Sequence, residues 1–166
     1  MDLTPATDQT LGLAQVLKTQ GFDLVLTVPC SILREWYFQP EGPPTVLLSR
    51  EEEGVGIAAG ALAAGNKPLL MIQNSGLGNC INALASLAVA YAIPMLVAVS
   101  MRGDEVDENP AQRPMGLATT ALISAIGSQF TTIEDHQDTS KIIQEGLDIA
   151  QHQNRPYFVL LPRRAP

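Results

Sequence analysis

The sequence has few of the residues on which several common kinds of site depend. Cys30 and Cys80 are the two cysteines in 166 residues and show no CxxC spacing, so neither a disulfide framework nor a zinc or redox motif is indicated. There are two histidines, His136 and His152, and no GxSxG motif surrounds a serine. We therefore expect no serine-nucleophile chemistry and no metal site. Cys80 is expected to fill the core, and both histidines are expected at the surface.

Basic residues and long apolar runs are also scarce. The ten Lys and Arg residues are spread along the chain, and the net charge of −7 with a pI near 4.7 argues against nucleic acid, which requires a clustered basic face. No apolar run reaches the ~18 residues of a membrane span. The first residues, 1–5, lack the charged and apolar regions of a secretory signal. A cytoplasmic protein that binds neither membrane nor nucleic acid is expected.

What the sequence does contain is a regular alternation of apolar runs and helical patterns. The runs predict strands at 23–28, 45–48, 68–73, 94–100, 129–133 and 156–161, and the patterns between them predict helices at 8–20, from 31, and at 51–64, 77–91, 116–126 and 137–152. Continuously apolar strands are covered on both faces. We predict an α/β fold with a doubly wound, six-stranded parallel sheet, forming a single domain over residues 1–166. Ligands of such sheets bind beyond the carboxyl ends of the strands, which directs attention to the loops at 29–31, 49–53, 74–79 and 101–115.

Three consecutive glutamates, Glu51, Glu52 and Glu53, begin the predicted helix at 51–64. One interpretation is a capping box between Ser49 and Glu52, with all three carboxylates stabilised by the positive end of the helix dipole. The other gives Glu51 a chemical role, because it stands where a strand ends and its helix is rich in Gly and Ala. A carboxyl group there, covered by a second protein surface, can exchange a proton with a heterocyclic nitrogen.

The run Asn74-Ser75-Gly76-Leu77-Gly78-Asn79 follows another strand. It contains neither GxGxxG nor GxxxxGK[ST], so it fits a phosphate cradle poorly. A simple tight turn is one interpretation. The alternative is a backbone that passes flat under a planar ligand, with Gln73 and Asn74 supplying amide contacts.

The segment 101–115 is long for a loop, and long loops in compact domains are usually functional. It carries two arginines, Arg102 and Arg113. Arg102 is placed to bind an anionic substrate through a bidentate pair. A salt bridge from Arg102 to Asp104 or Glu105 is an equally good interpretation.

These residues together resemble the pyrimidine-binding domain of thiamine-diphosphate enzymes, in which a glutamate precedes a Gly in an Ala-rich helix start as Glu51 precedes Gly60. Within that group, the chain resembles the alpha subunits of sulfopyruvate decarboxylases from about residue 10 to 161. The motifs that carry this closer resemblance are VPC at 28–30, REEEG at 50–54, QNSGLGN at 73–79, RGD at 102–104 and PMG at 114–116. QNSGLGN also occurs in phosphonopyruvate decarboxylase, whereas REEEG favours the sulfonate enzyme.

The resemblance implies a function and a set of site residues. It implies decarboxylation of a 2-oxo acid, with 3-sulfopyruvate giving sulfoacetaldehyde and CO2, and phosphonopyruvate as the alternative substrate. By motif position Glu51 is the catalytic residue that hydrogen-bonds N1′ of the cofactor's aminopyrimidine. The implied contacts to thiamine diphosphate are Pro29, Glu51, Gln73, Asn74, Ser75 and Gly76, and the candidates for the anionic substrate are Cys30, Ser31, Arg50 and Arg102.

One element of the family is absent from the sequence. Thiamine-diphosphate enzymes hold the diphosphate and Mg2+ with GDG followed by NN, and this chain has neither. We therefore expect the chain to work only with a beta subunit that carries the GDG…NN domain and Mg2+. A non-catalytic partner or regulatory domain of the same fold is an alternative that the intact Glu51 disfavours. A flavodoxin-like nucleotide binder is disfavoured by the missing phosphate fingerprint.

Overall fold

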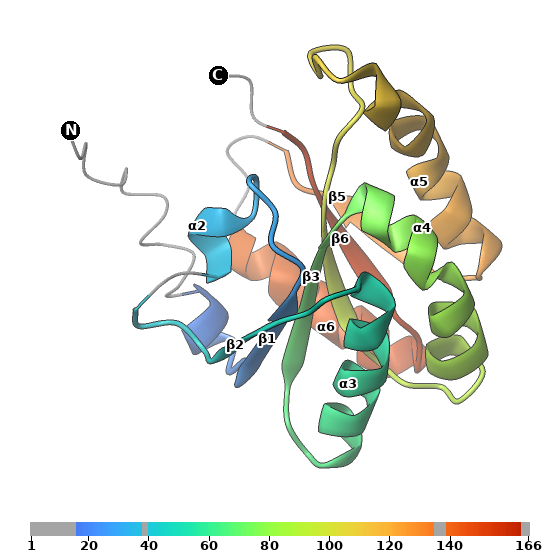
Figure 1. Ribbon diagram of the computed structural model, residues 1–166. Coiled ribbons are helices and arrows are strands. Elements are labelled where there is room, and N and C mark those ends of the chain that lie inside the picture. Colours follow the sequence, from blue (N-terminus) through green and yellow to red (C-terminus); the bar gives the residue numbers. More distant parts are fainter. Residues whose placement is uncertain (1–15, 38–39, 135–138, 164–166) are drawn as a thin grey trace.

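The computed structural model describes residues 16–37, 40–134 and 139–163, and contains the six-stranded parallel sheet that the sequence predicts (Figure 1). The strands are β1 (Leu24–Thr27), β2 (Thr45–Leu47), β3 (Pro68–Gln73), β4 (Leu96–Ser100), β5 (Gln129–Thr132) and β6 (Tyr157–Leu161). Their order across the sheet is β2-β1-β3-β4-β6-β5. In the two central strands Leu70 pairs with Val97, and both side chains are completely buried.

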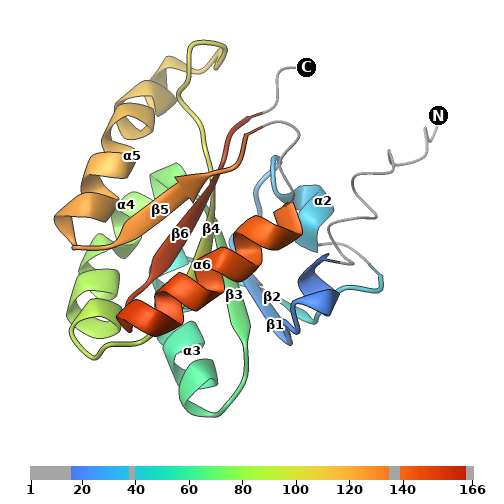
Figure 2. The same cartoon turned by 180° about the vertical axis from the view of Figure 1, so that it is seen from behind.

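Helices cover both faces of the sheet, as a doubly wound fold requires (Figures 1 and 2). They are α2 (Arg34–Tyr37), α3 (Glu51–Ala63), α4 (Asn74–Ala83), which continues as the π-helical η1 (Leu84–Val89), the 3-10 helix η2 (Pro110–Gln112), α5 (Arg113–Ala125) and α6 (Thr139–Gln153). One core cluster packs α3, α4 and α5 against the sheet, and a second packs α6 and Tyr37 of α2 against the opposite face. None of the described helices is long and apolar enough to cross a membrane.

Glycine brings α3 close to the sheet. Gly54 is buried, and a Cβ at this position would lie 2.5 Å from Cδ1 of Leu70 and 2.7 Å from Cδ1 of Leu48. Gly56 and Gly60, on the outer side of the same helix, have open space around them. The Gly- and Ala-rich composition of α3 therefore allows a close approach on its inner side and leaves a smooth surface on its outer side.

Most predicted boundaries agree with the structure to within three residues, and one prediction is wrong in kind. The run at 74–79 is not a loop, because α4 begins at Asn74 directly after β3 and includes the whole run. Neither the tight turn nor the flat backbone passing under a ligand is therefore correct. Most of the predicted helix 8–20 lies outside the described residues. Within the described part, residues 16–19 are helical, and the turn ends at Gly21, which has a φ of 71°.

The topology places the ends of three strands side by side. The chain passes from β1 to the edge strand β2, returns to β3 on the other side of β1, and continues outward to β4. A direction change of this kind leaves a crevice at the carboxyl edge of an open parallel sheet. The segments that follow β1, β3 and β4 all meet at this edge of the sheet.

Candidate functional site

The three glutamates at the start of α3 have different surroundings. Glu52 is paired with Arg50, whose Nε lies 2.5 Å from Oε1, and the Glu53 carboxylate accepts a hydrogen bond of 3.2 Å from the backbone N–H of Ser49. The side chain of Glu51 makes no hydrogen bond or ion pair with another described residue. Of the three carboxylates, the one at Glu51 has neither oxygen paired among the described residues, whereas Glu52 has only Oε2 unpaired.

The predicted capping box between Ser49 and Glu52 is wrong. The N-cap residue is Arg50, in an extended conformation and without a side-chain cap, so the residue three positions into the helix is Glu53. Its carboxylate reaches back over the first turn to Ser49. A hydrogen bond from its own backbone N–H, followed by the one from Arg50, holds the pKa of Glu52 below its ordinary value.

The half-buried side chain of Glu51 lies across the start of α4. A Cβ atom built on Gly76 would overlap Oε1, Cδ and Cγ of Glu51. Cys80, one turn further along α4, is completely buried, as expected for a core cysteine. Burial and then the charges of Glu51 and Glu52 raise the pKa of the Cys80 thiol to about 12. The Glu51 carboxyl group therefore lies against the bare backbone of Gly76, and the thiol whose pKa its charge raises is uncharged.

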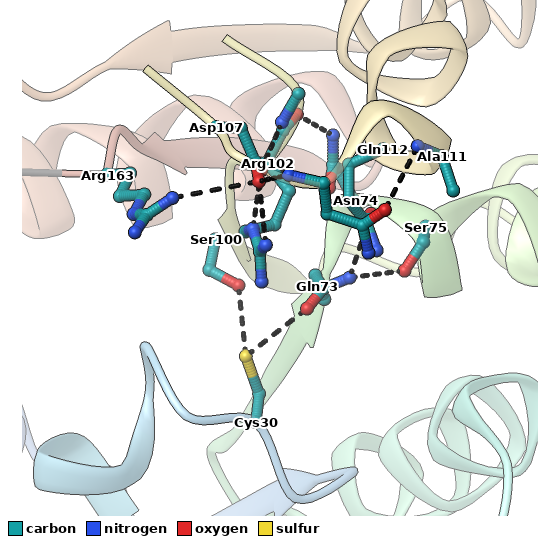
Figure 3. Close-up of polar contacts among 12 residues, drawn as sticks. Cys30, Gln73, Asn74, Ser75, Ser100, Arg102, Asp107, Ala111, Gln112 and Arg163 are labelled. Carbon is teal, nitrogen blue, oxygen red and sulfur yellow. Dashed lines mark hydrogen bonds and ion pairs between the residues drawn. The ribbon is translucent and has the colours of Figure 1, made fainter.

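A second group of side chains meets where β1, β3 and β4 end (Figure 3). The Sγ atom of Cys30 lies 3.6 Å from both Oε1 of Gln73 and Oγ of Ser100. The Gln73 amide N–H in turn donates to the hydroxyl of Ser75 at 2.6 Å and to the side-chain oxygen of Gln112 at 3.3 Å. The structure thus brings together three of the predicted site residues, Cys30, Gln73 and Ser75, at the carboxyl ends of these strands.

The two residues that flank Cys30 among the predicted contacts, Pro29 and Ser31, are both exposed. The backbone of Cys30 is held by Tyr37, whose hydroxyl accepts a hydrogen bond from the Cys30 N–H at 3.2 Å and donates to its carbonyl oxygen at 3.3 Å. This pair of hydrogen bonds fixes the turn that carries all three residues over the end of β1.

Asn74 has a structural task that the sequence did not predict. The residue is completely buried. Its amide N–H groups donate to the carbonyl oxygen of Arg102 at 2.9 Å and to the hydroxyl of Thr119 at 3.2 Å, while its oxygen accepts from the Arg102 N–H at 3.2 Å. This placement argues against the direct amide contact with a ligand that was expected of Asn74, because its hydrogen-bonding groups are committed to the loop after β4.

Arg102 is also committed to a protein partner, and the partner is neither Asp104 nor Glu105. Its Nε and Nη2 atoms donate to the Asp107 carboxylate at 2.6 and 2.8 Å (Figure 3). Arg163, at the end of β6, approaches the same carboxylate at 3.7 Å. The hydrogen bonds from Arg102 and then from the Gly103 N–H hold the pKa of Asp107 well below its ordinary value. The guanidinium of Arg102 is therefore poorly disposed to bind an anionic substrate.

Ser100 and Asp107 are among the residues of this site that sequence reasoning missed. Ser100 is a buried strand residue, and an apolar strand run gives no sign that its last side chain faces a thiol. Asp107 had a weak signal nearby, because Asn109 followed by Pro110 is a helix-start pattern. In the structure Asn109 caps η2 through a hydrogen bond from Ala111 N–H at 3.1 Å, which indicates that this segment is an ordered turn.

Comparisons with known proteins identify relatives of this chain. No protein-family profile matches the chain. It is 38% identical over 148 residues to the sulfopyruvate decarboxylase subunit alpha of Methanothermobacter thermautotrophicus, covering 87% of this chain and 90% of that protein. The subunit alpha of Methanococcus maripaludis is 35% identical, with 85% and 86% covered. The phosphonopyruvate decarboxylase of Streptomyces viridochromogenes is 32% identical over 86% of this chain and 37% of that protein.

Solved structures show the same fold. The thiamine diphosphate-dependent 4-hydroxybenzoylformate decarboxylase of Rhodococcus jostii superposes with a TM-score of 0.68 at 20% identity, covering 92% of this chain and 29% of that one. The benzoylformate decarboxylase of Polynucleobacter necessarius gives a TM-score of 0.66 at 18% identity, with 95% and 31% covered. With its motifs, its fold and these relatives in agreement, the chain belongs to the family of sulfopyruvate decarboxylase alpha subunits.

Proposed function

We propose that this chain is the alpha subunit of a cytoplasmic, thiamine-diphosphate-dependent decarboxylase that converts 3-sulfopyruvate to sulfoacetaldehyde and CO2. The observation that carries the proposal is the state of Glu51: it begins a helix at the carboxyl edge of the sheet, and its carboxylate has no hydrogen-bonding partner among the described residues. Thiamine diphosphate, when bound, supplies the electron sink that a 2-oxo acid needs to lose CO2.

The chain's own part in this chemistry centres on one proton. Glu51 would share it with N1′ of the aminopyrimidine, as a general acid and base does. The residues present fit the aminopyrimidine. Gly76 has no side chain, and a Cβ atom there would fill the place of the Glu51 carboxyl group that is to meet N1′. Gln73, Ser75 and the turn at Pro29 are our remaining candidates for contacts with the cofactor.

A substrate with a carboxylate and a sulfonate needs at least one cation. Arg50 is our candidate, because its side chain is 66% exposed and only its Nε atom is used by Glu52. Arg102 ranks behind it, since Asp107 takes two of its N–H groups. Ser31 is exposed in the turn after β1 and offers a neutral hydrogen bond, and Cys30 lies next to it in the chain.

One side of the molecule is suited to a partner chain. The layer formed by α3, α4, η1 and α5 is seen on the right of Figure 1. Beyond the first turns of α3 and α5 it contains no charged residue, whereas α6 on the other face carries Lys141, Glu145 and Asp148. Its exposed residues include Ile57, 41% exposed, and Leu117, 83% exposed. Uncharged surfaces of this extent mark interfaces, and we propose that a beta subunit covers this one.

The lengths of the relatives support a partner. The sulfopyruvate decarboxylase of Methanosarcina acetivorans is 36% identical to 89% of this chain, which matches only 38% of that longer protein. The remainder is long enough for the GDG…NN segment, which we propose that a beta subunit supplies to this chain together with Mg2+.

The experiment is co-expression with the reading frame next to this gene, followed by measurement of CO2 release from 3-sulfopyruvate and phosphonopyruvate. We expect activity only from the complex, with thiamine diphosphate and Mg2+, and a higher kcat/KM for sulfopyruvate. Faster turnover of phosphonopyruvate would favour the alternative substrate, which the Streptomyces relative makes the second candidate. Turnover by the isolated chain would refute the split site, and an inactive complex that fails to bind the cofactor would favour a non-catalytic domain.

A further inference from the structure

We infer that Gly76 is a positioning residue, which orients the carboxyl group of Glu51 by leaving room for it. The expected effect on catalysis rests on the function proposed above, whereas the packing of Glu51 against Gly76 does not. Gly76 is buried in the first turn of α4, and an alanine there would overlap three atoms of the Glu51 side chain. If position 76 carried a side chain, either the Glu51 side chain would have to move or α3 and α4 would have to separate.

The orientation of Glu51 depends on shape because no hydrogen bond fixes it. Glu52 and Glu53 are each held by a donor, whereas the Glu51 carboxylate has none among the described residues. Packing against the bare backbone of Gly76 keeps the carboxyl group in place while both oxygens stay available to a ligand. A donor from the protein would compete for the same oxygens.

A Cβ atom at the other glycines of these two helices would not meet Glu51. Glycine destabilises a helix interior relative to alanine, so each one needs a reason. Gly56 has open space where a Cβ would stand, and Gly78 would meet only the end of the flexible Met115 side chain, at 3.1 Å from Cε. Gly78→Ala is therefore a matched control: the same substitution, on the same helix, two residues away and clear of Glu51.

The packing is tested by thermal melting of the full chain without cofactor. Gly76→Ala should lower the melting temperature by about 2 °C or more, the shift expected for a modest overlap in a chain of this size. In a Glu51→Ala background, where the overlapping atoms are gone, the same change should be neutral or raise it. Gly78→Ala should have the same small effect in both backgrounds. Equal losses from Gly76→Ala in the two backgrounds would overturn the inference.

The positioning role is tested in the complex by H/D exchange at C2 of saturating thiamine diphosphate. Gly76→Ala should slow the exchange by about tenfold or more, within the range for a displaced acid–base group, and should slow it no further in the Glu51→Ala background. Exchange at the wild-type rate in Gly76→Ala would overturn the positioning role.

If the wild-type complex shows no exchange, the proposed function fails, and the melting temperatures of the variants alone decide whether Gly76 packs against Glu51. If Gly76→Ala does not fold, recovery of folding by Glu51→Ala supports the inference, and continued failure overturns it.

Discussion

The guanidinium of Arg102 and the carboxylate of Asp107 form a bidentate pair that closes the loop after β4. The Asp107 side chain is completely buried, and that of Arg102 is 20% exposed. The same carboxylate accepts hydrogen bonds from the backbone N–H groups of Gly103 at 2.9 Å and Asn109 at 3.1 Å. A buried charge is stable only when it is paired and hydrogen-bonded, and here the loop backbone completes the set. The pair therefore orders the segment that follows β4.

This pair predicts a dependence of stability on pH. The pKa of Asp107 is lower in the folded chain than in the unfolded one, so its contribution is complete above the ordinary carboxyl pKa of ~3.9 and is lost as the pH falls below it. Asp107→Asn should lower the melting temperature at neutral pH. It should also reduce the fall in melting temperature as the pH is lowered into the acid range. Melting curves from neutral to acid pH measure both effects. The exposed Asp104→Asn is the control, and an unchanged acid slope in Asp107→Asn would contradict this assignment.

Alanine substitutions of Arg50 and Arg102 should have different effects on the kinetics of charged and uncharged substrates. Arg50→Ala should raise KM for sulfopyruvate more than for 2-oxobutyrate, which has an uncharged tail, because the lost cation faces an anion only in the first case. Arg102→Ala should reduce kcat/KM for both oxo acids alike and lower the melting temperature, because it removes the main partner of the buried Asp107 charge and leaves it to the more distant Arg163, at 3.7 Å. Steady-state kinetics of the complex with both substrates makes the comparison. If Arg102→Ala reduced kcat/KM for sulfopyruvate alone, Arg102 would be assigned to binding of the anionic substrate.

The glutamates at the start of α3 should differ in catalysis. Glu51→Gln keeps the shape of the side chain and a hydrogen-bonding group but cannot share a proton, so C2 exchange should slow by roughly 10²–10⁴. Glu52→Gln and Glu53→Gln should exchange at close to the wild-type rate, since their carboxylates are bound to Arg50 and Ser49. Thermal melting controls for folding. If either of these two variants stalls while Glu51→Gln does not, the position of the motif has been misassigned.

Two glycines should respond to alanine in opposite directions. Gly103 has a φ of 87°, and a Cβ there would lie 2.7 Å from the carbonyl carbon of Gln112. Gly103→Ala should therefore lower the free energy of unfolding by ~2 kcal/mol or more. Gly60→Ala fills open space in a helix and should raise it by ~0.5–1 kcal/mol. Urea denaturation of the isolated chain measures both, and a stabilised Gly103→Ala would show that the strain is absent.

The sequence alone determined the sheet and the position of the principal candidate. Apolar runs such as 68–73 that alternate with helical patterns favour a parallel sheet covered by helices on both faces, and Gly21 and Gly65 end helical turns with positive φ values. Glu51 was identified by its place in a motif, and the structure adds that its carboxylate is unpaired among the described residues. These features depend on local pattern, which a linear sequence carries in full.

Only the tertiary structure decided that residues 74–79 are helical and that Arg102 binds Asp107. A run with two glycines is a weak helix former by propensity, but burial of Asn74 with all of its hydrogen bonds satisfied, and contact of Gly76 with Glu51, favour the helix. Four carboxylates follow Arg102 within six residues of the sequence, and the path of the loop places that of Asp107 against its guanidinium. Such outcomes depend on which groups the fold removes from water together, and that is set by contacts between segments far apart in the chain.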